Sequence, residues 1–92
     1  MIANEQKKQE IFIRLKVVIE HVLQISREKN LRNRIEVAWN TDIINDLEID
    51  SLEIMDLIGA VEKEFGISLN IEKVVSQRII REIVDYIYMI LQ

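Results

Sequence analysis

Apolar residues recur at helical spacing through the first part of the chain, with charged residues between them. From about residue 4 to residue 26 this pattern predicts a long first helix, because its apolar side chains would form one continuous stripe. The members of that stripe are Ile11, Leu15, Val18, Ile19, Val22 and Leu23. His21 falls near the edge of the stripe, so we expect it to be a surface or half-buried structural residue.

A polar and basic stretch at residues 27–34 predicts the end of this helix and the start of a long loop that runs to residue 50. Connections of this length are uncommon unless they pack on the core or carry function, and we expect both here. Apolar residues are scattered along the loop, and among them we expect Trp39 to be a packing residue.

The second helix is predicted from about residue 51 to residue 65. Asp50 can cap its first turn, Glu53 can bond back to the cap residue, and Gly66 is placed to end it. A short third helix fits residues 71–75 with Asn70 as its cap. A fourth fits residues 77–91, with an apolar face of Ile79, Ile80, Ile83, Val84, Ile87, Ile90 and Leu91. The predicted fold is therefore all-α, a single four-helix domain that covers residues 1–92.

The second helix carries apolar residues on two different faces. At about 100° per residue, one arc holds Ile54, Leu57, Ile58, Val61 and Phe65, and this arc must be the buried stripe. Leu52, Met55 and Gly59 fall about 100–160° away from Ile54, so they cannot all share the core. Leu52 and Met55 beside Ser51 form a plausible docking patch on the exposed side.

The composition narrows the possible functions. The chain has 92 residues, which is enough for one modest core. It has no cysteine and a single histidine, which excludes disulfides, thiolate zinc sites, cysteine nucleophiles and multi-histidine metal sites. No apolar run is long enough to cross a membrane and no signal peptide pattern is present, so we expect a cytoplasmic protein. Because few of the usual catalytic groups are present, we expect that it is not an enzyme, and we expect a monomer.

Charge is distributed unevenly between the two parts of the chain. Residues 1–35 hold eight Lys and Arg against four Asp and Glu, whereas residues 36–92 hold four against twelve. The later part therefore favours a partner with a basic surface, and it argues against nucleic acid as the partner there.

Ser51 would be the first residue of the second helix, with its hydroxyl outside the buried stripe. A phosphate ester at this position would gain about 0.3–1 kcal/mol from the helix dipole and the free N–H groups of the first turn. An ordinary serine at a helix start has the same features, so geometry alone leaves both interpretations open.

The residues around Ser51 resemble a known family. Residues 46–57, Asp-Leu-Glu-Ile-Asp-Ser-Leu-Glu-Ile-Met-Asp-Leu, are similar to the attachment segment of acyl carrier proteins, whose signature is Asp-Ser-Leu before an acidic and apolar helix. The similarity continues at residues 61–65, Val-Glu-Lys-Glu-Phe, and at residues 83–87, Ile-Val-Asp-Tyr-Ile. About half of the chain matches closely, and the four-helix plan covers all of it.

This resemblance implies that Ser51 receives 4′-phosphopantetheine from a magnesium-dependent phosphopantetheinyl transferase, with Asp50 part of what that enzyme recognises. The cofactor would supply the thiol that the sequence lacks, and acyl groups would be carried on it as thioesters for enzymes of fatty-acid, lipid or specialised acyl biosynthesis. Acyl-loading, acyl-transferring and condensing enzymes with basic docking surfaces are the expected partners. The expected docking residues are Leu52, Glu53, Met55, Asp56, Gly59 and Glu62.

The sequence also departs from the family pattern. Glu48 stands where the family usually has Gly, Ile49 replaces a small residue, and Gly59 stands where a larger apolar docking residue is common. Lys63 interrupts the run of acidic residues that the family has at the positions of residues 61–65. These differences favour a specialised carrier with a dedicated pathway over the general fatty-acid carrier.

Three alternatives stay open at this point. A D-alanyl or aminoacyl carrier would share the helices and the serine, and an unmodified helical adaptor could keep the fold without the cofactor. A calcium-binding loop is suggested by Asp42, Asp46, Asp50 and Glu53 at positions 1, 5, 9 and 12, but Ile44 and Leu47 occupy positions where that loop needs a ligand and a glycine.

Overall fold

The computed structural model describes residues 2–26 and 36–92, and in this part of the chain it has four helices and no β-strand longer than an isolated bridge. Their bounds are α1 Ile2–Ser26, α2 Ser51–Phe65, α3 Ile71–Gln77 and α4 Ile80–Leu91. The predicted all-α fold is therefore confirmed. The basic segment at residues 27–34 lies outside the described residues.

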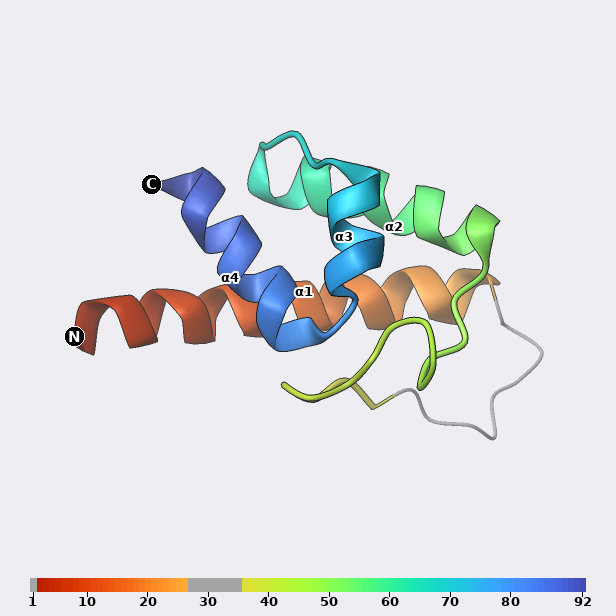
Figure 1. The fold of residues 1–92 in the computed structure, drawn as a ribbon, viewed down its shortest axis with the longest axis horizontal. Helices are drawn as coiled ribbons and strands as arrows, with labels where there is room; N and C mark the ends of the chain where they lie inside the picture. Colours follow the sequence, from red (N-terminus) through yellow and green to blue (C-terminus); the bar gives the residue numbers. More distant parts are fainter. Residues whose placement is uncertain (1, 27–35) are drawn as a thin grey trace.

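The long helix α1 forms one side of the molecule and packs against both α2 and α4 (Figure 1). Its buried residues follow helical spacing, as the sequence predicted: Ile11, Leu15, Ile19 and Leu23 are at most 3% exposed. Val18 and Val22 are half-buried at the edge of this stripe, and His21 is exposed. The facing helices supply Ile54, Leu57, Val61 and Phe65 from α2, and Ile80, Ile83, Val84 and Ile87 from α4.

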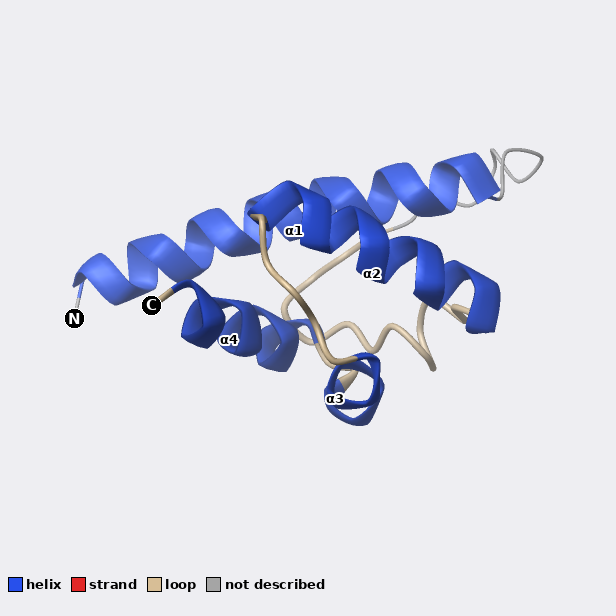
Figure 2. Ribbon diagram, turned by 90° about the horizontal axis from the view of Figure 1, so that it is seen from above, coloured by secondary structure: helices blue, strands red, loops and turns tan. Residues whose placement is uncertain are grey.

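The short helix α3 runs across the direction of α1 and α2, and it is seen almost end-on in Figure 2. Gly66 ends α2 in the left-handed conformation, with φ 65°. The Glu62 carboxylate then accepts the Leu69 backbone N–H at 2.7 Å, and Asn70 caps α3 by accepting from Lys73 N–H at 3.1 Å. The predicted caps at residues 66 and 70 are both confirmed.

The fourth helix begins at Ile80, so the predicted start at residue 77 is wrong. Helix α3 continues to Gln77, two residues beyond its predicted end, and Arg78 closes it in the left-handed region with φ 40°. Ile79 is extended and forms a single antiparallel bridge with Asp42 of the long loop. The loop therefore forms hydrogen bonds with backbone groups that would bond within the helix if α4 ran through residues 77–79.

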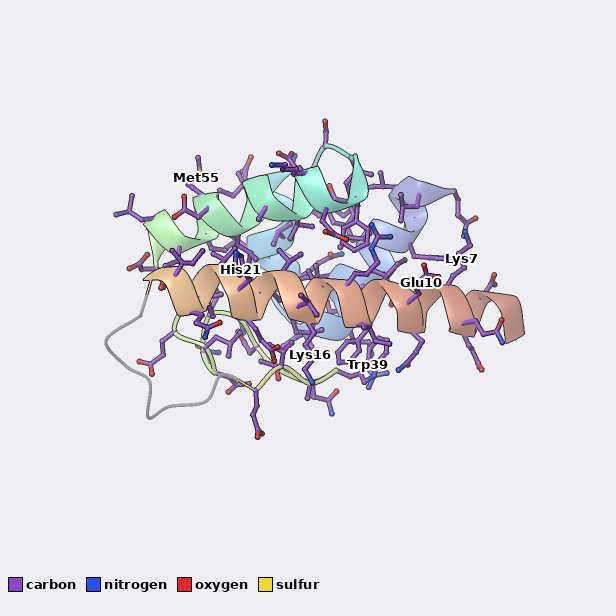
Figure 3. The ribbon with its side chains drawn as sticks, turned by 180° about the vertical axis from the view of Figure 1, so that it is seen from behind. Lys7, Glu10, Lys16, His21, Trp39 and Met55 are labelled. Atoms are coloured by element: carbon purple, nitrogen blue, oxygen red, sulfur yellow. The ribbon has the colours of Figure 1, made fainter. Side chains whose placement is uncertain are left out.

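The described part of the long loop, residues 36–50, packs on the helices rather than projecting from them. Val37, Ile43, Leu47 and Ile49 are buried in the core. Trp39 is half-buried and stacks on Phe12 of α1, with the ring centroids 4.3 Å apart and the planes at 11°. Figure 3 shows Trp39 beside α1, on the side away from α2. The predicted packing role of Trp39 is confirmed.

None of the helices in the described residues combines the length and the apolar character that a membrane span needs.

Candidate functional site

The first turn of α2 is fixed by a reciprocal pair of hydrogen bonds. Asp50 has extended backbone angles, and its Oδ1 accepts the Glu53 N–H at 2.9 Å. Glu53 Oε1 accepts the Asp50 N–H at 3.2 Å. This is the predicted capping box, and it fixes where the helix begins.

Ser51 is the first residue of α2 and is exposed. Within the described residues its hydroxyl has no hydrogen-bond partner, and the backbone N–H groups of Ser51 and Leu52 have none either. Free N–H groups at a helix start attract anions, because they add to the positive end of the helix dipole. The position therefore fits a phosphate ester: the hydroxyl is accessible, and two donors lie beside it.

The face of α2 next to Ser51 combines exposed apolar and acidic side chains. Leu52 is 79% exposed and Met55 is 61% exposed, while Asp56 and Gly59 are also at the surface. Figure 3 shows Met55 on the outer side of α2, pointing away from α1. The predicted separation between the buried stripe and this second arc is confirmed.

Two of the six expected docking residues have hydrogen-bond partners within the protein. Glu53 is only 8% exposed, because its carboxylate turns inward to complete the capping box. The expectation that Glu53 presents its charge to a partner is therefore corrected. Glu62 is half-buried, and its carboxylate holds the Leu69 N–H of the connection to α3.

The carboxylates of the hypothetical calcium loop are used within the protein. Asp42 is 7% exposed; its Oδ1 accepts the N–H groups of Ile44 and Asn45 at 2.8 and 2.9 Å. Asp46 Oδ2 accepts the Asp42 N–H at 2.8 Å, and Asp50 and Glu53 form the capping box. In the described residues no three or more His, Cys, Asp and Glu side chains are grouped so that they could hold a metal ion.

Asp42 is also paired with a residue that the sequence did not connect to it. Its Oδ2 lies 2.9 Å from Arg78 Nε. The pKa of Asp42 is lowered below its ordinary 3.8, first by the hydrogen bond from the Asn45 N–H and then by the Ile44 N–H bond and by Arg78. Desolvation opposes this shift. Asp42 by itself is a signal for such a turn, because an aspartate side chain can accept the backbone N–H two residues further on, but no local pattern pointed to Arg78.

Comparison with known proteins identifies the family. A family model described as a phosphopantetheine attachment site matches residues 14–87, which is most of the chain. The chain belongs to this phosphopantetheine attachment family. The predicted acyl-carrier-type membership is thereby confirmed, and the family's covalent group is 4′-phosphopantetheine.

Curated relatives of the family agree with this assignment. An acyl carrier protein of Coprothermobacter proteolyticus is 28% identical over 81 residues, covering 88% of this chain and 90% of its own. An acyl carrier protein of Buchnera aphidicola is 34% identical, covering 80% of this chain and 85% of its own. An acyl carrier protein AcpXL of Rhizobium etli is 37% identical over a shorter span, 59% of each chain. No solved structure matches the chain.

Membership of the phosphopantetheine attachment family makes this chain a carrier rather than an enzyme. The structure agrees with the requirements of such a carrier at Ser51, since the residue is exposed at a helix start with free donors beside it. Leu52, Met55, Asp56 and Gly59, which we expect from the sequence to contact partners, share one exposed face that begins next to that serine.

Proposed function

We propose that this protein is an acyl carrier in which Ser51 is the attachment site of 4′-phosphopantetheine. In this proposal the arm holds acyl groups as thioesters and presents them to enzymes of fatty-acid, lipid or specialised acyl biosynthesis in the cytoplasm. The observation that carries the proposal is the exposed Ser51 hydroxyl at the first residue of α2, in a chain that belongs to the attachment family.

The attachment reaction uses a small number of groups from this chain. The Ser51 oxygen forms a bond to the phosphorus of coenzyme A that carries the pantetheine. The bond from that phosphorus to the adenosine bisphosphate leaving group breaks, and the hydroxyl proton passes to a base on the transferase. The free N–H groups of the first turn stabilise the resulting phosphodiester charge.

Asp50 can serve the helix and the transferase at the same time. Its Oδ1 accepts the Glu53 N–H at 2.9 Å, while Oδ2 has no hydrogen bond to a described residue. This second oxygen is exposed with the rest of the residue next to Ser51. We therefore assign Asp50 to transferase recognition, through the carboxylate oxygen that the cap leaves free.

Partner enzymes would dock on the exposed face of α2. Leu52 and Met55 supply apolar contacts, and Asp56 supplies a negative charge that attracts a basic partner surface. Lys63 is the one basic residue of α2 and lies in its last turn, away from Ser51. An acyl cargo is favoured over an aminoacyl cargo because the curated relatives are named acyl carrier proteins.

Intact-mass measurement tests this proposal directly. Purified protein is incubated with coenzyme A, magnesium and a phosphopantetheinyl transferase of broad specificity. The wild type should gain the mass of one phosphopantetheine, and Ser51→Ala should gain none while its circular dichroism stays unchanged. Ser68→Ala, which removes another exposed hydroxyl, is the matched control and should be modified like the wild type.

Two results would contradict the proposal. Wild-type protein that never gains the mass would favour the unmodified adaptor, and a Ser51→Ala variant that still gains it would move the attachment to another residue. Loading of the modified protein with acyl groups and with amino acids by their respective ligases then separates the acyl carrier from the aminoacyl carrier.

A further inference from the structure

The backbone of Ile43 connects two distant parts of the structure. Its N–H donates to the Arg78 carbonyl at 3.0 Å, and its own carbonyl accepts the Ile49 N–H at 3.1 Å. The first bond reaches the junction between α3 and α4, and the second reaches the segment that leads into Asp50 and Ser51. Ile43 is fully buried, so both bonds are shielded from water.

Asp42 fixes the residues on both sides of this connection. Its carboxylate accepts three hydrogen bonds within the 42–45 turn, from the Ile44 and Asn45 N–H groups and from Asn45 Nδ2 at 3.0 Å. Its Oδ2 also pairs with Arg78 Nε at 2.9 Å. One nearly buried side chain therefore closes the turn and attaches it to the α3–α4 junction.

Arg78 contributes its backbone conformation as well as its charge. It is in the left-handed region with φ 40°, which a residue with a side chain adopts only at a cost in free energy. This conformation ends α3 and lets the following residues meet the loop: the Ile80 N–H donates to the Thr41 carbonyl and the Arg81 N–H to the Trp39 carbonyl, each at 2.9 Å. Leu47 and Ile49, both buried, complete the attachment of the loop to the core.

We propose that Asp42 and Arg78 are positioning residues for Ser51. Their ion pair holds the loop against the α3–α4 junction, and through Ile43 and Ile49 it sets the path along which the chain enters the capping box. The contacts that the structure gives these two residues lie within the loop and at the α3–α4 junction, and none of them is with the exposed face of α2. The inference rests on the proposed function, because its kinetic consequence is expressed in the modification of Ser51.

The ion pair between Asp42 and Arg78 should act mainly on recognition of the protein by the transferase. When the pair is lost, the loop samples other conformations, and only a fraction of molecules present Ser51 correctly. If that fraction falls to about one third, the apparent KM for the carrier rises about threefold. The turnover number should change less, because a correctly bound carrier still offers the same hydroxyl.

Two variants remove the pair without requiring a different backbone conformation. Asp42→Asn keeps an oxygen for the turn but loses the charge that faces Arg78. Arg78→Asn is too short to reach Asp42, and asparagine tolerates the left-handed backbone better than most residues. The matched control is Arg14→Gln, which removes an ion pair of the same 2.9 Å length between α1 and Glu64, at the far end of α2.

Each protein is measured for transferase KM and kcat and for amide hydrogen exchange, at a temperature where circular dichroism shows it folded. We expect the two loop variants to raise KM about threefold and to speed exchange of the Ile43 and Ile49 amides, with Arg14→Gln like the wild type in both. The double variant should be no worse than Asp42→Asn alone, because the two residues act as one pair. If one variant fails to fold, the other carries the test.

A KM for both loop variants within the range of the wild type and Arg14→Gln would overturn the inference, and so would unchanged exchange at Ile43 and Ile49. These outcomes differ from failure of the proposed function. In that case the wild type itself is not modified, while the exchange measurement still decides whether the pair orders the loop.

Discussion

Gly59 allows a sharp test, because the structure shows that this glycine is not required for another segment to pack closely against α2. It lies in the middle of α2 and is exposed, and a Cβ added there would have no atom within 4 Å outside its own helix and neighbours. Gly59 is therefore not needed for close packing. Glycine inside a helix costs about 0.5–1 kcal/mol relative to alanine, because the unfolded chain loses more conformational freedom on folding.

We expect Gly59→Ala to raise the free energy of unfolding by about 0.5–1 kcal/mol. For a domain of this size, that change raises the melting temperature by about 2–8 °C. The urea midpoint should rise by about 0.2–1 M with an unchanged m value. Urea melts followed by Trp39 fluorescence and by circular dichroism measure the midpoint and the m value, and thermal melts measure the melting temperature.

Gly66→Ala is the matched control. Its Cβ would also meet open space, but Gly66 has φ 65°, where a residue with a Cβ is strained. This variant should lower stability by about 1 kcal/mol, so the two alanines act in opposite directions for a backbone reason alone. A lowered midpoint for Gly59→Ala, with Gly66→Ala behaving as expected, would refute the argument from open space and helix propensity.

The remaining predictions concern charge and the cap. Asp42 has a lowered pKa in the folded protein, so its stabilising effect is complete above pH 3.8 and is lost as the pH falls below that value toward the folded pKa; the stability difference between wild type and Asp42→Asn should therefore shrink in acid urea melts, and a constant difference would contradict it. Asp50→Ala should cost about 1 kcal/mol in thermal unfolding, because α2 loses its N-cap; no change would mean that the cap contributes nothing. Asp56→Lys should slow modification at low salt and lose that effect at high salt, whereas equal rates across a salt series would refute docking through this charge. Gly59→Met should leave the fold intact and change which acyl-handling enzymes accept the carrier; unchanged preference across a panel would remove Gly59 from the docking surface.

The features that the sequence predicted well depend on local rules. Helical spacing places Ile11, Leu15, Ile19 and Leu23 on one face of α1, and each is buried. The capping box at the start of α2 needs only residues three apart, so it could be recognised without knowledge of the fold. The exposed position of Ser51 followed from the same local geometry.

The features that the sequence did not predict depend on contacts between distant residues. Ile79 fits the apolar pattern of α4, yet it is extended because it bridges to Asp42, 37 positions earlier. Glu53 was expected both to cap α2 and to dock a partner, and the cap buries it. The pairing of Asp42 with Arg78 has no periodic signature, because an ion pair across a loop depends on how the helices are packed.

Helix α1 begins and helix α4 ends at the same end of the molecule, while the first turn of α2 is at the other end (Figure 1). The Tyr88 hydroxyl donates to Asn4 Oδ1, so the last turns of α4 are held against the beginning of α1. A tag, a surface linker or a neighbouring domain joined at either terminus would therefore lie at the opposite end of the molecule from the first turn of α2. The protein can be immobilised or fused through either end with its serine still facing outward.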